Sequence, residues 1–235
     1  MKKIALAAIL FTGCLQNGIA QTENNSTAGA KEKSTEMYIG VQLNALIRQV
    51  FNFNNTSANT NTNPYLLNYS INSRKSGLGL RFGVGYNYNS STTNDGITKT
   101  EINLNDLQLR LGGEKVFKLS KKWVTGAGVD IVYNNNDDHT INTVNSGSIG
   151  GGQKTDTKTT IATYGGGPQG WLRYHISEKV LIGTEASFYF VAGTEERSVT
   201  VTNGFPNPTN QKPVSNDVSH GVFNSPIAFF IMVKF

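Results

Sequence analysis

The chain ends in an alternating segment that runs from Ser225 to Phe235. Successive side chains of a β-strand point to opposite faces of the sheet. With that period, one face holds Ile227, Phe229, Ile231, Val233 and Phe235, and the other holds Ala228, Phe230, Met232 and Lys234. Because the alternation continues to the last residue, we expect a strand with one face toward lipid and the other toward the interior of a closed barrel.

The composition favours an all-β fold. Charged residues make up 16% of the 235 residues, whereas an average soluble domain has about 25%. The 25 glycines and the segments rich in Asn, Thr and Ser are typical of strands and turns rather than helices. The net charge of +5 is scattered, and no basic cluster is interleaved with aromatic residues, so nucleic acid is not an expected partner.

The N-terminus has the pattern of a signal peptide over residues 1–20. The pair Lys2-Lys3 precedes an apolar stretch from Ile4 to Phe11, and Gly18-Ile19-Ala20 matches a small-x-small cleavage site. The apolar stretch is too short to span a bilayer as a helix. We therefore predict an exported protein whose residues 21–36 form a flexible periplasmic segment.

The only cysteine, Cys14, lies inside this targeting segment. Phe11-Thr12-Gly13-Cys14 resembles a lipoprotein box, in which the cysteine is acylated, although the usual first residue is Leu. Cleavage after Ala20 is favoured because the small-x-small match is better. A soluble β-barrel attached through lipidated Cys14 remains an alternative.

Eight alternating segments of the length of membrane strands follow, the last being the C-terminal run. The first extends from about Tyr38 to Val50, and the second begins near Tyr65. The clearest is the third, in which Leu78, Leu80, Phe82, Val84, Tyr86 and Tyr88 alternate with Gly79, Arg81, Gly83, Gly85 and Asn87. The alternation predicts apolar side chains on the lipid face of every segment and polar ones on the interior face.

The connections between these segments alternate in length. Short connections lie at residues 74–76, 120–122 and 177–179, and long connections cover about 53–63, 89–99, 134–158 and 193–221. Bacterial outer-membrane barrels have an even number of strands, short periplasmic turns and long outer loops. The sequence therefore predicts an eight-stranded antiparallel up-and-down transmembrane β-barrel over residues 37–235, with four long extracellular loops.

This pattern resembles the small eight-stranded outer-membrane barrels of the Bacteroidetes type, similar in architecture to the OmpA and OmpX barrels. The resemblance rests on Asn63-Pro-Tyr-Leu-Leu-Asn-Tyr69, on Gly77-Leu-Gly-Leu-Arg-Phe-Gly-Val-Gly-Tyr86 and on the terminal Phe235. It implies location in the outer membrane and outer-membrane lipid as a partner. It also implies recognition of the last strand by the barrel-assembly machinery, and we expect no peptidoglycan-binding domain.

Two sets of residues are candidates for functional or structural sites. An interior of eight strands is just wide enough for side chains to fill it, so we expect a plugged lumen with an ionic network rather than an open pore. Its predicted members are Arg48, Arg81, Arg110, Arg173, Asp106, Glu114, Asp130 and Glu185. Counting across the short turns places Arg110 opposite Asp130 and brings Arg173 within diagonal reach of Glu185.

Aromatic residues near the ends of the lipid face predict two girdles at the membrane interfaces. The outer girdle comprises Tyr65, Tyr86, Tyr88, Tyr133, Phe188 and Phe190. The periplasmic girdle comprises Phe117, Trp123, Tyr174 and Phe235.

The sequence gives little sign of catalysis. The three histidines lack the spacing of metal ligands, and neither a phosphate-binding loop nor a nucleophile-elbow serine is present. We therefore expect a non-enzymatic protein without catalytic residues, metal or cofactor, whose role is structural or depends on surface interactions of its outer loops with an unidentified ligand. A narrow solute channel is one alternative, and a barrel hydrolase using Asp137-Asp138-His139 is another.

Overall fold

The computed structural model describes residues 34–43, 64–144, 152–202 and 209–235. Most of them belong to one antiparallel sheet of ten strand segments. In chain order these are β1 (Thr35–Gln42), β2 (Leu67–Ser73), β3 (Leu78–Asn94), β4 (Thr98–Lys118), β5 (Trp123–Val144), β6 (Gln153–His175), β7 (Val180–Thr202), β8 (Thr209–Asn210), β9 (Val214–Asn224) and β10 (Phe229–Lys234). Within the described ranges, no helix has the length and apolar character needed to cross a bilayer.

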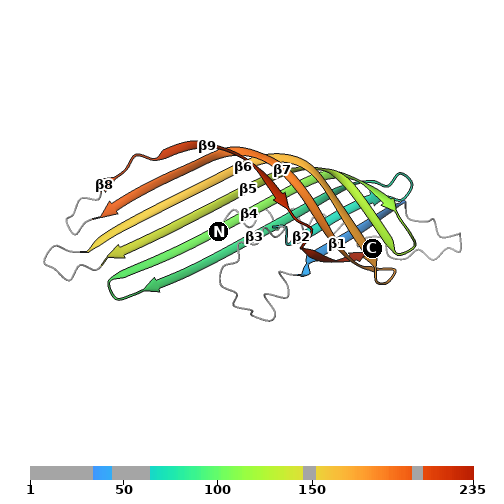
Figure 1. Ribbon diagram of the computed structural model, residues 1–235, viewed down its shortest axis with the longest axis horizontal. Coiled ribbons are helices and arrows are strands. Elements are labelled where there is room, and N and C mark those ends of the chain that lie inside the picture. The colour runs from blue at the N-terminus through green and yellow to red at the C-terminus, as the bar shows by residue number, and fades with distance from the viewer. Residues whose placement is uncertain (1–33, 44–63, 145–151, 203–208) are drawn as a thin grey trace, which may run out of the picture. The chain divides into compact units, whose positions relative to one another are not determined.

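The sheet closes on itself through β1. Ile39 of β1 pairs with Val233 of β10 on one side and with Tyr69 of β2 on the other. The strands then follow in chain order to β7, which pairs back with β10 and completes the ring (Figure 1). Since β8, β9 and β10 all lie along β7, the ring has eight positions when these three segments count as one interrupted strand. The prediction of an all-β antiparallel fold is therefore confirmed.

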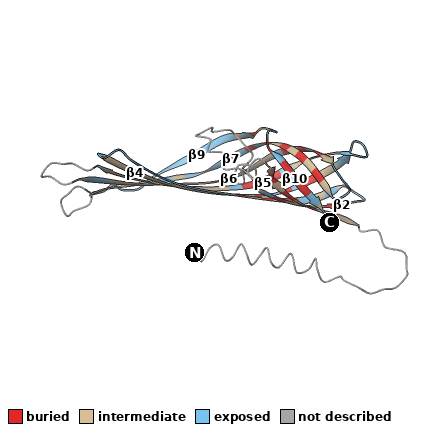
Figure 2. Ribbon diagram, turned by 90° about the horizontal axis from the view of Figure 1, so that it is seen from below, coloured by how far each residue is buried: buried red, intermediate tan, exposed pale blue. Residues whose placement is uncertain are grey.

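Side chains in the ring alternate between an exposed apolar face and a buried polar face. On β3, Leu80 is 60% exposed and its neighbour Arg81 only 4%. On β5, Ile131 is 69% exposed whereas Asp130 is fully buried. Figure 2 shows the buried residues gathered where β2 and β10 lie, in the closed part of the sheet. The alternation predicted for these strands is confirmed, with the apolar face outward.

Strands β3 to β7 continue well past the ring. They contain 17, 21, 22, 23 and 23 residues, whereas a tilted strand crosses a bilayer with about 9–11. We call this continuation the extension. It comprises residues 87–94, 98–106, 134–144, 153–163 and 193–202, together with residues 214–218 of β9, which pair with β7 there. In Figure 2 it is coloured mainly as exposed and intermediate, because it is a single sheet with both faces accessible.

The extension corrects the predicted loops. Most of residues 89–99, 134–158 and 193–221 lie in strands, with described turns only at residues 95–97 and 211–213. Residues 53–63, predicted as the first long loop, lie outside the described residues, as do the signal peptide and the central parts of two other predicted loops. β1 also begins at Thr35, ahead of the predicted start of the barrel at residue 37.

The error has a physical cause. Polar composition indicated loops, but threonine is β-branched and is as well suited to a strand as valine. Within the extension Ile102 pairs with Thr140, and Thr157 pairs with Val199. Alternating Thr and aliphatic residues therefore hold the strand conformation where neither face meets an apolar environment.

The β3–β4 turn carries a sequence signal for a hairpin. Gly96 has φ of 89°, a conformation that favours glycine. The Asp95 carboxylate accepts hydrogen bonds from the backbone N–H groups of Thr98 and Ile97, at 2.6 and 2.9 Å. These N–H groups hold the pKa of the Asp95 carboxyl below its usual value. The Asn94-Asp95-Gly96 sequence thus defines a tight turn in a region first interpreted as a loop.

The seam of the ring is fastened by Glu36. Its carboxylate accepts a hydrogen bond from Lys234 Nζ of β10 at 2.7 Å and lies 3.3 Å from Arg74 Nε, just after β2. The Tyr38 hydroxyl donates to the second carboxylate oxygen at 2.7 Å. One β1 carboxylate therefore links the closing strand to both of its neighbours.

We predict that Glu36→Gln weakens the seam. The variant loses the charge that pairs with Lys234 and Arg74, at a cost of about 1 kcal/mol for partly exposed ion pairs. The measurement is the temperature at which the compact form disappears on unheated detergent gels. Glu178→Gln, in an exposed turn, is the matched control. An unchanged temperature for Glu36→Gln would show that the seam does not depend on this carboxylate.

Candidate functional site

The interior of the ring is filled in layers, which can be followed along β7. Its inward residues run in order from Leu181 through Glu185 to Tyr189. Leu181 belongs to an apolar cluster with Tyr38, Ala228, Phe230 and Met232. At the other end, Tyr189 belongs to a cluster with Tyr65, Val132 and Val191. The charged residues lie at the level of Glu185, between these two clusters.

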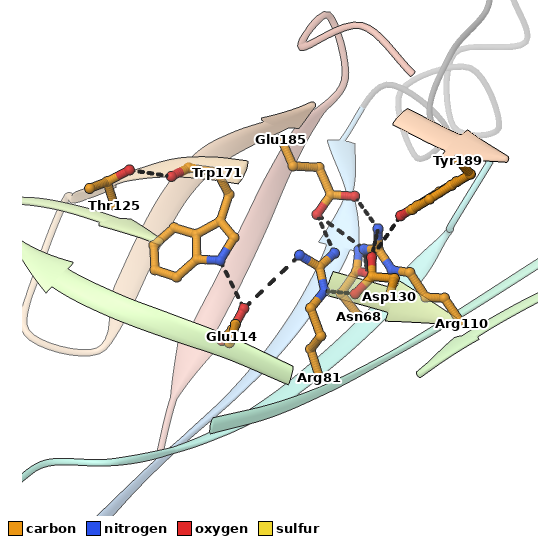
Figure 3. A network of polar contacts seen from close by, with 9 residues as sticks. All are labelled: Asn68, Arg81, Arg110, Glu114, Thr125, Asp130, Trp171, Glu185 and Tyr189. Atoms are coloured by element: carbon orange, nitrogen blue, oxygen red, sulfur yellow. Dashed lines mark hydrogen bonds and ion pairs between the residues drawn. The ribbon is translucent and has the colours of Figure 1, made fainter. Parts of the chain in front are cut away.

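Glu185 is the centre of the charged layer (Figure 3). Arg110 donates to both of its carboxylate oxygens, from Nη1 at 2.5 Å and from Nη2 at 3.0 Å. Arg81 Nη2 donates to the same carboxylate at 2.8 Å. Nε of the Arg81 guanidinium also lies 3.5 Å from Oδ1 of Asp130. Strands β3, β4, β5 and β7 are thereby joined across the interior.

Neutral donors complete the coordination of the remaining carboxylates. The Tyr189 hydroxyl donates to Asp130 Oδ2 at 2.6 Å. The Trp171 indole N–H donates to Glu114 Oε2 at 2.8 Å, and Arg81 Nη1 lies 4.0 Å from the same oxygen. Asp130 and Glu114 therefore each accept a hydrogen bond from a neutral donor in addition to facing an arginine, as buried charges require.

Aromatic rings support the arginines of this layer. The Arg173 guanidinium lies 3.6 Å from the ring centroid of Trp171, and that of Arg110 lies 4.1 Å from the centroid of Tyr65. Both distances are within the range of cation–π interaction. Together with Arg81, these arginines supply three positive charges against the carboxylates of Glu114, Asp130 and Glu185. The buried layer is therefore neutral overall.

The interior leaves little free space around this layer. A cavity beside Arg81 and Glu185 has a volume of about 10 Å³, enough for about one water molecule. Ser70 Oγ and Arg81 Nη1, both of residues that line this cavity, have no hydrogen-bond partner within the described residues. A water at this position would satisfy such groups.

The structure brings together only some of the predicted ionic residues. Arg81, Arg110, Glu114, Asp130 and Glu185 form the network, and Arg173 joins it through its aromatic contact. The prediction that Asp106 belongs to this network is wrong. Asp106 lies in the extension, partly buried, where Asn136 of the neighbouring strand donates to its carboxylate. Arg48 lies outside the described residues.

The predicted registers are partly corrected. Asp130 pairs with Gly112, and Arg110 pairs with Val132. The β4–β5 turn is centred on Lys121, within the predicted connection at residues 120–122, and counting from this centre makes Arg110 and Asp130 diagonal neighbours rather than a directly opposite pair. Their contact is an ion pair of 3.9 Å. Glu185 pairs with Trp171, which places Arg173 diagonally across from it, as predicted.

Tyr65 is also corrected. It was expected in the outer girdle, but it is 1% exposed and lies in the interior beside Arg110. The residue precedes β2, which begins at Leu67, so the strand alternation does not apply to it. Trp171 and Tyr189 also lie on the inward face, and the sequence analysis did not identify them as donors to buried carboxylates. The available signal was an aromatic side chain with a polar tip at an inward position among carboxylates.

The other predicted girdle residues lie on the outward face of the sheet, with Tyr88 just inside the extension. Those that are exposed are Tyr86, Tyr88, Tyr133, Phe188, Phe190, Phe117, Trp123 and Phe235. Tyr174 is half-buried because its ring packs against Trp123, with centroids 4.9 Å apart. Tyr164 and Phe223 are exposed aromatic residues of the same face that sequence reasoning did not include.

In the acid–histidine segment, Asp138 and His139 do not face each other. Neighbouring residues of β5 point to opposite faces, so Asp138 and His139 are separated by the sheet. His139 Nε2 instead lies 2.8 Å from Asp156 Oδ1 on β6. Among the hydrogen bonds of the described residues, no hydroxyl or thiol is joined to this pair. The described residues also contain no cluster of three or more potential metal ligands.

These features define a class of protein: a closed antiparallel β-barrel with a neutral ionic interior, an apolar outward face and a long extension of the sheet. The chain belongs to a family of unknown function, DUF6850, which it matches over residues 10–214. No curated protein and no solved structure matches the chain.

We predict that Arg110→Ala destabilises the ring strongly. The change leaves Glu185 and Asp130 buried without their main counter-charge, at a cost of about 3–5 kcal/mol. Equilibrium unfolding by urea in detergent measures this loss. Arg197→Ala, at an exposed arginine of the extension, is the matched control. Equal stability of the two variants would contradict the role given to the network.

A second test exploits the close approach of Trp171 to the sheet. A Cβ atom at Gly126 would lie 2.3 Å from ring carbons of Trp171, whereas at Gly113 it would meet no atom within 4 Å. We therefore expect Gly126→Ala to cost about 1–3 kcal/mol through overpacking. Gly113→Ala should change the free energy of unfolding by less than about 0.5 kcal/mol. A similar effect of both variants would show that the packing of Trp171 against Gly126 does not limit stability.

Proposed function

We propose that this chain is a non-enzymatic integral protein of a bacterial outer membrane, in which the ring crosses the lipid and the extension forms a platform on the cell surface. The observation that carries the proposal is the exposed apolar face of the ring. Its members on the central strands include Leu78, Leu80, Leu111, Val129, Ile131, Leu172, Ile231 and Val233. Soluble monomers rarely expose apolar surface continuously around the molecule.

Backbone pairing supports the same proposal. Lipid offers no hydrogen-bond partners, so a spanning sheet must be closed. β1 pairs with β2 and β10 and removes both edges where the apolar face lies. Exposed aromatic residues such as Tyr86 and Trp123 lie toward the two ends of this face, as in interfacial girdles. The inverse arrangement, required by a soluble barrel on a lipid anchor, would place apolar side chains inward and charges outward.

The filled interior favours a structural or surface-interaction role over a solute channel. Two apolar clusters enclose the neutral charged layer, and the cavity beside Arg81 has room for only about one water molecule. An ion would have to displace the Arg110–Glu185 pair to pass. Recognition is therefore assigned to the extension, and the exposed Phe235 at the end of the last strand is the group offered to the barrel-assembly machinery.

The proposal is tested by folding the protein into vesicles of phosphatidylcholine. We expect heat-modifiable migration on detergent gels and protection of the ring from added protease. Leu80→Arg puts a charge in the middle of the apolar face and should disfavour insertion by about 2–4 kcal/mol. Thr92→Arg lies on the same face of β3 but in the extension, and should insert like the parent protein.

Two outcomes would count against the proposal. A soluble monomer without detergent would refute membrane insertion. Equal insertion of Leu80→Arg and Thr92→Arg would refute the assigned lipid face. Stable conductance steps in planar bilayers, on the other hand, would replace the filled-interior role by that of a channel.

A further inference from the structure

An open hollow lies on the outward face of the sheet where β5, β6, β7 and β9 run side by side. Its volume is about 420 Å³, and its lining includes Tyr133, Tyr164, Ala162, Ala192, Asp217 and Ser219. That volume is within the range of small-molecule sites. The lining residues come from four strands, so the pairing of the sheet determines their arrangement.

The strand register arranges the hollow as two adjacent rows of side chains. In one row, Tyr133 faces Tyr164, which faces Ala192, which in turn faces Ser219. In the next row, Ala162 faces Thr194, and Thr194 faces Asp217. The two alanines leave space between the tyrosine rings on one flank and the polar groups on the other. The hollow therefore has an aromatic flank, a small-residue floor and a polar flank.

The hollow lies at the boundary between the apolar face and the polar extension. In the row on the ring side of Tyr164, Ile131 and Phe190 are 69% and 66% exposed. On the opposite side follow Thr160 and Glu196, which are paired with each other. With the ring in lipid, this boundary coincides with the headgroup layer. A ligand in the hollow would thus be at the depth of the polar part of a lipid.

We propose that this hollow binds a sugar ring carried by a membrane glycolipid. A pyranose ring has an apolar C–H face, which complements the negative face of an aromatic ring such as Tyr164. Its hydroxyl edge matches the Asp217 carboxylate and the Ser219 and Thr194 hydroxyls, which are exposed and form no side-chain hydrogen bond within the described residues.

Other occupants fit less well. An acyl chain would leave the Asp217 carboxylate without a polar partner, at a cost in free energy. A phosphate would be repelled by the same carboxylate, and the lining contains no Lys or Arg to offset this. A compact ammonium group would have to contact the aromatic rings and the Asp217 carboxylate at the same time. Tyr164 and Ser219 are two strand spacings apart, about 10 Å, which suits a broader ring-shaped ligand.

The experiment measures binding of fluorescent lipopolysaccharide to the folded protein in detergent. We expect Tyr164→Ala and Asp217→Asn each to weaken binding about tenfold, from loss of the aromatic contact or of a charged hydrogen-bond acceptor. Tyr88→Ala is the matched control, because Tyr88 is an exposed outward tyrosine that is not part of the hollow. This variant should bind like the parent protein.

Competition identifies the part of the lipid that is bound. The deacylated oligosaccharide should compete, and phosphatidylethanolamine should not. Equal competition by phosphatidylethanolamine, or unchanged binding by both hollow variants, would overturn the sugar site.

The inference rests on the proposed membrane insertion, and the two fail differently. If the parent protein is a soluble monomer without detergent, the membrane proposal fails whatever the sugar affinity. If insertion behaves as expected but the hollow variants bind normally, only the sugar site fails.

Discussion

The contact on which the ring depends is the bidentate pairing of Arg110 with Glu185, shared by Arg81. These arginines are 75 and 104 residues from Glu185 in the sequence. A buried carboxylate or guanidinium is costly unless it is paired, so neither the Arg110 charge nor the Glu185 charge can be buried without the other. The pairing therefore requires β3, β4 and β7 to be close at once, which only the closed sheet provides.

The charged interior and the apolar outward face both follow from the alternation of side chains along each strand. Because a slip of one residue would turn every side chain to the opposite face, the interior charges also fix the registers of the ring strands. A slip of β3 would move Arg81 outward and Leu80 inward. Such a slip would leave the buried carboxylates without their paired arginine, which makes alternative registers unfavourable.

The sequence predicts the ring well because period-two alternation is a local property of each strand. It predicts which residues of β3, β5 and β7 face inward, but it cannot give the geometry of their contacts. Arg110 reaches across the interior to Glu185, a contact between strands that are not neighbours, and the residue directly opposite Asp130 is Gly112. The prediction for Tyr65 is wrong for a related reason. Tyr65 precedes β2, and the alternation of a strand carries no information about residues outside it.

The sequence does not predict the extension, because the polar composition of these segments is also typical of loops. Strand formation and burial are separate properties, and threonine satisfies the first without the second. Thr157 and Thr159 on β6 retain regular pairing with β5 and β7 although both faces of the sheet are accessible. Alternation of apolar and polar residues thus detects a strand only where the two faces meet different environments.

Continuity between ring and extension has a consequence for recognition. β5, β6 and β7 pass from one to the other without a break in chain, so the surface above the ring is held by the same pairing that the ionic layer secures below. Only the side chains change along these strands, from Ile131 and Phe190 through Tyr133 and Tyr164 to Thr160 and Glu196. A ligand at that transition is positioned by the rigid part of the sheet rather than by a loop, so little ordering entropy opposes its binding.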